Sequence, residues 1–516
     1  MTFIRRNVYE VGGDWAGPIL WYARGVAAMQ KRALADVTSW RFYGGIHGFY
    51  KPYWEAYGYL TSSDKMPSQP DLDRYWDQCQ HSTWYFPPWH RGYLITFEKI
   101  VRAAIVQAGG PADWALPYWN YFKKEQNRLP PAFASKDWPD GKGNNPLFVD
   151  ARFGPNNDGN VYVPLDSINL NAMGEPVYTG VASGGSPGFG GVDTGFNHGG
   201  GTFGRLESQP HNIVHVKVGG ANPAPPKLPG LMSTPPLAGL DPIFWLHHAN
   251  IDRLWEAWIK NPPTHSDPTI LKWLNGPGFI GQRIFSMPLP NGAPWNFTPR
   301  DVNDLSKLDY SYDTLVPGAA VKLAADRLKL LGVSPSVVES QQGVSAMTNG
   351  NNVELVGANR GSLQLVGSEA ETSVELDPGV RQKVSSSLNL AAKAVAADAA
   401  APDRVFLNLE NIRGIADATA FQVYINLPQG EDPAAHPELL AGTVGLFGVR
   451  EASLIDEKHA GQGLTVALEI TDIVDRLHLN NALDADKLNI RIFPANPVAK
   501  EDNITIGRFS IFRHGQ

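Results

Sequence analysis

Six histidines of this chain are spaced as two sets of three that could bind metal ions. His81 and His90 stand nine positions apart, on either side of an aromatic and proline-rich turn. His211 and His215 stand four apart, so a helix would place both rings on one face. Imidazole nitrogens held by a stiff, dry backbone suit a borderline transition metal. One histidine upstream and one downstream complete the two sets, which are His47, His81 and His90, and His211, His215 and His248.

The residues around these histidines resemble the two copper-binding signatures of the tyrosinase family, whose members hold a pair of copper ions. The first block matches the family pattern at His81, Phe86, Trp89, His90, Arg91, Leu94 and Glu98. The second block matches it at Asp241, Pro242, Phe244, His248 and Asp252. The resemblance covers roughly the first three-fifths of the chain, and it implies two copper ions as the cofactor with the six histidines as ligands.

The resemblance also assigns supporting roles around the ligands. In the family pattern the second histidine of the pair His247-His248 is the ligand, which leaves His247 beside the site. Glu98 and Asp252 are expected to orient ligand rings, as the outer partners of metal-bound histidines do. The alternative for both carboxylates is an ordinary structural ion pair.

The residue types agree with copper better than with other metals. Neutral imidazole binds copper in both oxidation states, and three per ion leave one coordination position open. A hard cation would require carboxylates, and none stands among the histidines. A zinc protease would show His-Glu-x-x-His, whereas His211 and His215 enclose Asn-Ile-Val.

Cys79 is the only cysteine of the chain, so an internal disulfide is excluded. It stands two residues before His81, and this spacing resembles the family's cysteine–histidine thioether, a covalent bond to a ligand ring. The resemblance therefore implies a Cys79–His81 crosslink. The alternative is an inert buried thiol.

The family contains enzymes that hydroxylate monophenols and enzymes that only oxidise o-diphenols to o-quinones with O2. Members that hydroxylate resemble one another in a glutamate shortly before the fourth ligand and an asparagine directly after it, which together hold a water as base. Glu207 and Asn212 occupy those positions, so the resemblance implies a tyrosinase with small phenols and O2 as partners. The alternative for Glu207 is a solvated acid at a helix start.

Two other functions compete with the tyrosinase interpretation. A catechol oxidase or an o-aminophenol oxidase would differ only in its substrate. An oxygen carrier of the hemocyanin kind would belong to another class of protein. Carriers typically occur as linked repeats, whereas this chain has one site, and its loop 231–236 has no aromatic residue to cover the metals.

Helices must bring the histidines together. Apolar residues at helical spacing predict helices over residues 15–32, 36–48, 91–107 and 247–260, and another is expected around His211 and His215. Metal sites between facing helices of a four-helix bundle are well known, so we expect one here. Residues 127–204 read as a long glycine-rich loop, and His198 within it is expected to be solvated.

The pattern changes after Tyr312, where short alternating strands predict a β-sandwich or barrel. The expected fold is multidomain α + β, with a dicopper domain at 1–315, a linker at 316–352 and a β-rich domain at 353–516. The resemblance implies that this last domain is a lid that keeps the enzyme latent, with one side chain plugging the entrance to the coppers. Leu427 and Leu439 are apolar candidates for the plug, cleavage is expected within residues 334–352, and the histidines 436, 459, 478 and 514 are expected at the surface. A helix over 319–331 and a flexible excursion over 391–402 complete these expectations.

Composition sets the remaining bounds. A chain of 516 residues is long for one core, which favours two domains. The net charge of -7, without a basic patch, argues against nucleic acid, and no stretch is apolar enough to span a membrane. The first residues lack the apolar core of a signal peptide, so we expect a cytoplasmic protein. The sequence carries no signal for an oligomeric state.

Overall fold

The computed structural model describes residues 2–139, 143–225, 227–261, 264–319, 327, 330–331, 352–392, 402–456, 459–480 and 486–515. The expected linker at 316–352 lies mostly outside the described residues, and its cleavable stretch almost wholly so. Most of the helix expected at 319–331 and of the excursion expected at 391–402 lies outside them too.

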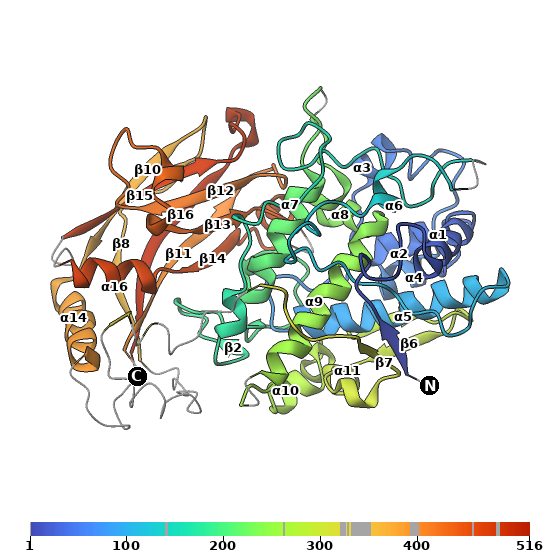
Figure 1. Cartoon of the computed structure of the whole chain (residues 1–516), viewed down its shortest axis with the longest axis horizontal. Coiled ribbons are helices and arrows are strands. Elements are labelled where there is room, and N and C mark those ends of the chain that lie inside the picture. Colours follow the sequence, from blue (N-terminus) through green and yellow to red (C-terminus); the bar gives the residue numbers. More distant parts are fainter. Residues whose placement is uncertain are drawn as a thin grey trace.

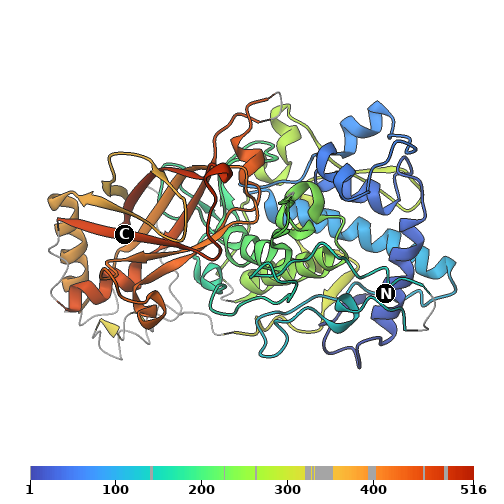
Figure 2. The same cartoon turned by 90° about the horizontal axis from the view of Figure 1, so that it is seen from above.

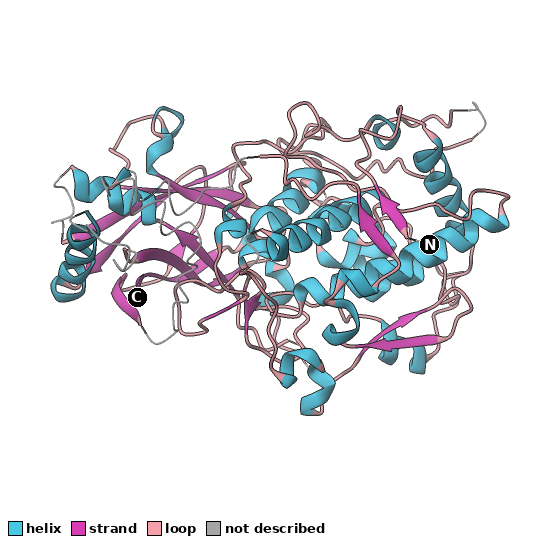
Figure 3. Ribbon diagram, turned by 60° about the horizontal axis from the view of Figure 1, so that its bottom comes forward, coloured by secondary structure: helices cyan, strands magenta, loops and turns pink. Residues whose placement is uncertain are grey.

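Two bodies lie side by side, a helical domain before residue 320 and a sheet domain after residue 351 (Figures 1 and 2). Figure 3 shows the helices gathered in the first body and the long strands in the second. Each body has its own cluster of buried apolar side chains. Ala420 and Phe447 of the sheet domain belong to the helical cluster, and Phe203 of the helical domain belongs to the sheet cluster, so the two cores interlock.

Helices of the helical domain are α1 Gly17–Gln30, α2 Trp40–His47, α3 Lys51–Ala56, α4 Gln69–Tyr75, α5 Phe86–Gln107, α6 Pro131–Ala134, α7 Ile213–Gly219, α8 Pro235–Ala238, α9 Pro242–Lys260, α10 Leu271–Leu274 and α11 Pro299–Val302. Short helical turns are η1 Asn171–Gly174, η2 Glu207–Asn212, η3 Leu231–Ser233, η4 Pro277–Ile280 and η5 Leu305–Lys307. Its strands are β1 Phe3–Arg5, β2 Thr179–Gly180, β3 Gly191–Val192, β4 Gly201–Thr202, β5 Phe285–Pro288, β6 Pro294–Phe297 and β7 Tyr310–Tyr312.

The long helices α5 and α9 pack against each other at the centre of the helical domain (Figure 1). Both are buried on nearly every face, as expected of helices inside a large core. Prolines stand in the first turn of each, where a missing N–H costs nothing. Asp241 caps α9 by accepting from the backbone N–H of Ile243. Helix α1 packs against α5, α2 packs against α1, and the turn η2 before α7 packs against α9, so the histidine-bearing elements share one helical core. None of the described helices is both long and apolar enough to cross a membrane.

A buried ion network joins the N-terminus to both central helices. The Arg5 guanidinium lies 2.6 Å from Glu98 of α5 and 3.3 Å from Asp252 of α9, and Arg91 lies 2.5 Å from Asp252. Burial by itself raises the pKa of Asp252, but Arg91 and Arg5 lower it below its ordinary value. Asp252 also accepts from the hydroxyls of Tyr310 and Tyr312, and Glu98 accepts from the backbone N–H of Leu116. The arginine contacts of both carboxylates are the structural ion pair considered from the sequence.

The sheet domain consists mainly of one curled sheet. Its strands are β8 Val353–Ala358, β9 Leu363–Gln364, β10 Ala370–Leu376, β11 Arg404–Arg413, β12 Ala420–Ile425, β13 Leu440–Gly445, β14 Leu464–Glu469, β15 Lys487–Pro494 and β16 Thr505–His514. The order is β13-β12-β15-β10-β8-β16-β11-β14-β4, with β9 beside β16. Gly442 of β13 comes close to Leu468 of β14, so the sheet rolls toward closure. Three helices were not expected from the sequence, namely α14 Pro378–Ala392, α15 Val449–Ser453 and α16 Thr471–Leu479.

The last strand of that sheet comes from the helical domain. Strand β4 pairs in parallel with β14 through Gly201 and Leu464. Ion pairs reinforce the same face: Arg404 lies 2.9 Å from Glu175, and Arg205 lies 3.1 Å from Glu469. His514 is buried there and accepts from the backbone N–H of Ser186 at 3.0 Å, so the expectation that it lies at the surface is wrong. Backbone pairing and charge together hold the two domains in one arrangement.

Candidate metal centre

The six predicted histidines converge in the helical domain as two facing sets. His47 ends α2, His81 lies just before α5, and His90 lies within α5. Ring centroids in this first set are 5.3 to 5.9 Å apart. In the second set, Nε2 of His248 lies 3.3 Å from Nε2 of both His211 and His215. The His90 and His248 rings stack at 4.5 Å, so the two sets adjoin.

Hydrogen bonds to oxygen orient the rings. Nδ1 of His47, His90 and His215 lies 2.7 to 2.8 Å from a backbone carbonyl, and that of His211 lies 2.8 Å from the side-chain oxygen of Asn212. Because these oxygens can only accept, each Nδ1 carries the proton and each Nε2 keeps its lone pair. Burial lowers the pKa of His47 and of His211 to about 3, which keeps both rings neutral.

The donor set fits copper. Nε2 of His47 is buried and has no hydrogen-bond partner among the described residues, as expected of a nitrogen that awaits a ligand. Phe86 and Phe244 lie against the rings and exclude water. Neutral imidazoles in a dry, aromatic surrounding are the ligands that suit copper in either oxidation state.

His247 lies beside the second set, as the family pattern implies. It is fully buried, and its ring stacks on His211 at 5.3 Å. One ring nitrogen of His247 lies within 4.8 Å of a ring nitrogen of each of His211, His215 and His248. Nε2 of His248, and not a nitrogen of His247, lies 3.3 Å from Nε2 of both His211 and His215. This agrees with the family pattern, in which the second histidine of the pair is the ligand.

Cys79 faces the His81 ring. Its Sγ lies 3.4 Å from Nε2 and 3.7 Å from Nδ1 of His81, so it is directed at the edge of the ring that carries the carbon between them. Burial, followed by the nearby Glu207 and Glu451, raises the pKa of the Cys79 thiol well above its ordinary value.

Glu207 is buried at the centre, so the alternative of a solvated acid is wrong. Its carboxylate accepts from the backbone N–H of Ser82 at 2.9 Å, directly after His81. Burial raises the pKa of Glu207 well above its ordinary value. The residue thus links the two histidine sets, since its own turn η2 leads into His211.

An aromatic side chain from the sheet domain covers the histidines. The Phe447 ring stacks on His215 at 4.1 Å and lies 5.5 Å from His81 and 5.7 Å from His211. Phe447 therefore occupies the place for which Leu427 and Leu439 were candidates. The sequence signal that could have identified it is a phenylalanine between two glycines, Gly445 and Gly448. Gly448 has a φ of 82°, a conformation that glycine adopts readily in a tight turn.

His198 is buried, although its glycine-rich surroundings predicted a solvated ring. Its exposed fraction is 7%, and Nδ1 lies 3.0 Å from the carbonyl oxygen of Cys79. The reason is the sheet domain, since His459 lies 6.0 Å away across the boundary. His459 was expected at the surface, and its side chain there is partly covered, with an exposed fraction of 9%.

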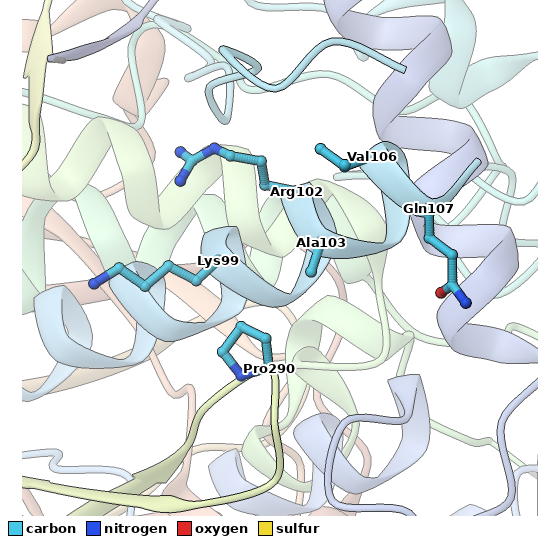
Figure 4. A pocket seen from close by; sticks show the side chains of 6 residues that line it. All are labelled: Lys99, Arg102, Ala103, Val106, Gln107 and Pro290. Carbon is cyan, nitrogen blue, oxygen red and sulfur yellow. The ribbon is translucent and has the colours of Figure 1, made fainter. Parts of the chain in front are cut away.

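A surface groove with a volume of about 590 Å³ lies elsewhere on the helical domain. It runs along the outer face of α5, lined by Lys99, Arg102, Ala103, Val106, Gln107 and Pro290 (Figure 4). None of these residues contacts the histidine sets, and the groove contributes nothing to the metal centre.

Comparison with known proteins agrees with this centre. The family model described as the common central domain of tyrosinase matches residues 37–185 and 169–261, and a domain family of unknown function matches residues 352–514. A tyrosinase of Hahella sp. (strain CCB-MM4) is 33% identical over 98% of both chains. Catechol oxidase B of Solanum tuberosum is 31% identical over 45% of this chain and 38% of its own.

Solved structures of low identity share the fold over the whole chain. Latent apple tyrosinase has a TM-score of 0.57 at 21% identity, covering 99% of this chain and 97% of its own. A latent aurone synthase, a polyphenol oxidase, has a TM-score of 0.58 at 17% identity, covering 100% of this chain and 90% of its own. The chain belongs to the tyrosinase family and is a copper oxidoreductase with a dinuclear copper site.

Proposed function

We propose that the protein is a tyrosinase, which hydroxylates monophenols to o-diphenols and oxidises these to o-quinones with O2. The observation that carries the hydroxylase part is the buried carboxyl of Glu207 beside His81, together with Asn212 on His211. The name of the full-length relative from Hahella supports the same activity. Oxygen uptake and product formation with tyrosine, catechol and o-aminophenol, measured side by side, test the proposal.

The six histidines would hold the two ions. His47, His81 and His90 would bind one copper, and the set of His211, His215 and His248 would bind the other. When bound, the copper pair supplies the redox chemistry by which O2 reacts with a phenol ring. For His47, His90, His211 and His215, the hydrogen bonds at Nδ1 keep Nε2 unprotonated, and the aromatic side chains around the rings keep the centre dry.

Glu207 and Asn212 would prepare a monophenol for reaction. A phenol has an ordinary pKa of about 10, so it must lose a proton before its oxygen can bind a metal. Burial raises the proton affinity of Glu207, and the fixed Ser82 N–H holds the carboxyl in place. A water between Glu207 and Asn212 could then accept the phenolic proton.

Glu207→Gln should lower the rate of monophenol hydroxylation by about 10²-fold to 10⁴-fold, the usual contribution of one positioned base. Oxidation of o-diphenols should change far less, because it does not depend on that base. Measuring kcat/KM for a monophenol and for an o-diphenol, together with the copper content, tests this prediction.

Glu256→Gln is the control. It alters another buried glutamate, two turns beyond His248 on α9, and should leave the ratio of the two activities unchanged. Equal loss on both substrates in Glu207→Gln would indicate a role in folding or metal binding.

A catechol oxidase or an o-aminophenol oxidase is the second candidate, favoured by the similarity to a catechol oxidase. It would retain the copper ligands and Phe447 but show no oxygen uptake with tyrosine. The side-by-side rates separate the two candidates. An oxygen carrier finds no support, since the chain belongs to a family of oxidases.

We also propose the thioether between Cys79 and His81. Forming the S–C bond removes the thiol hydrogen and one ring hydrogen, an oxidation for which copper and O2 are the oxidant. After copper loading, the peptide that carries both residues should therefore be lighter by two hydrogens, and thiol reagents should not label Cys79. Mass spectrometry of digested protein, with copper-free protein as control, checks this. Full labelling of Cys79 in active, copper-loaded enzyme would refute the crosslink.

Latency is the last part of the proposal. Phe447 stacks on His215, where a phenol ring would have to approach the coppers. The sheet domain that carries it is held by strand pairing and ion pairs. The full-length protein would therefore have low activity until Phe447 moves away.

A further inference from the structure

The sheet domain packs directly against the turn that carries the proposed base. Strand β13 contacts both η2 and α7, and η2 holds Glu207 and Asn212. Gly445 lies so close that an added Cβ would be 3.1 Å from Ile213 and 3.2 Å from the carbonyl oxygen of Asn212. The end of β13 thus lies against the two elements that carry His211 and His215, and Figure 1 shows β13 beside α7.

Gln209 joins this turn to both domains. Its backbone is extended, with φ of −143° and ψ of 123°, because Pro210 follows it and disfavours helix at the preceding residue. The extended residue directs its side chain away from the turn into a buried site. Nε2 donates to the carbonyl of Thr443 in β13 at 2.9 Å and to that of Ser167 in the long loop at 3.3 Å. One amide therefore ties the turn to a strand of the other domain.

The position of this turn sets the geometry of hydroxylation. Glu207 stands two residues before Gln209, and Asn212 stands three after it. The carboxyl of Glu207 accepts hydrogen bonds from the backbone N–H of Ser82 and of Gly204, and its side chain is fully buried, so its position depends on the turn that carries it. A catalytic group displaced by about 1 Å can cost 10²-fold in rate.

We propose that Gln209 is a positioning residue for monophenol hydroxylation, and that the sheet domain supports the catalytic turn as well as covering the coppers. The inference rests on the proposed tyrosinase activity. It predicts that opening the centre while leaving the domain docked preserves hydroxylation, whereas loss of the Gln209 bridge selectively weakens it.

The test uses full-length Phe447→Ala protein as parent, so that access to the coppers does not limit either reaction. Adding Gln209→Met keeps the length of the side chain but removes the donor. The ratio of monophenol to o-diphenol kcat/KM should fall about 10-fold, mostly in the monophenol kcat, with copper content unchanged. Hydrogen exchange of copper-free protein should become faster in the peptide spanning residues 205–214.

The matched control is Asn496→Leu in the same parent. It removes another hydrogen bond between the domains, from Asn496 Nδ2 to the carbonyl of Pro155 at 3.3 Å. In this control, the ratio of monophenol to o-diphenol kcat/KM and the hydrogen exchange of residues 205–214 should equal those of the parent. Gln209→Leu serves as a second variant if the methionine protein does not fold.

An unchanged ratio and unchanged exchange in Gln209→Met would overturn the inference, as would an equal loss on both substrates. A parent that oxidises diphenols but hydroxylates no monophenol would refute the proposed function, and the inference with it. The Phe447→Ala parent alone tests the proposed function, and the added Gln209 substitution tests the inference, so failure of one can be told from failure of the other.

Discussion

Replacing Phe447 with alanine should raise the o-diphenol turnover of full-length, copper-loaded protein by up to about 100-fold, if the ring leaves the centre about 1% of the time. The ring stacks on His215 at 4.1 Å and approaches His81 and His211, so under the latency proposal it stands in the way of a substrate. Alanine removes the ring without cutting the chain or moving the domain. Oxygen uptake with catechol at constant copper content measures the effect.

Phe493→Ala provides the control for this experiment. Phe493 lies on β15 of the same domain, where its ring packs against Tyr424, remote from the histidines. The variant loses a ring of equal size and should stay as inactive as the parent protein. Activation of both variants would mean that a loosened domain, rather than the open entrance, raises turnover. A Phe447→Ala protein that is no more active than the parent would contradict the latency proposal.

His215→Ala should leave at most one copper ion per chain and abolish oxygen uptake with every phenol. His215 supplies one of the three Nε2 atoms of the second set, and its orientation depends on the Met232 carbonyl at 2.7 Å. Two remaining imidazoles provide too few ligands for a stable site, and both coppers are required for O2 chemistry. Elemental analysis of the purified protein and oxygen uptake measure the two consequences.

His265→Ala is the matched control, because His265 is also a buried histidine. Its ring stacks on Trp258 at 4.4 Å and hydrogen-bonds the Trp258 carbonyl, outside both histidine sets. This variant should lose some stability but retain two coppers. An active His215→Ala protein with a full copper content would disprove the assignment of the second set.

The sequence predicted which histidines come together because much of that information is local. His81 and His90 are close in sequence, and so are His211 and His215. Each pair therefore lies on a helix or on the segment just before it. The helix at α5 begins five residues earlier than predicted, at Phe86 rather than Arg91. Pro87 and Pro88 indicated a turn, yet they are first-turn residues of the helix, a place that prolines occupy readily.

What the sequence did not predict depends on contacts between the domains. Phe447, His198 and His514 all owe their surroundings to residues more than 100 positions away. Local hydrophobicity indicates that a phenylalanine is buried, but not against which surface. A lone histidine among glycines likewise indicates exposure until another domain covers it.

The pairing of β4 with β14 changes what a cut between the domains can achieve. While one chain joins them, docking is intramolecular and corresponds to an effective concentration of about the millimolar level. A cut turns docking into an association of two molecules, but the strand pairing and the ion pairs of Arg404 and Arg205 remain. The nicked enzyme would stay inhibited as a complex wherever its concentration exceeds the dissociation constant. Cleavage alone would therefore leave the activity low. Dilution, or a second cut within the sheet domain, would then separate the sheet domain from the helical domain and raise the activity.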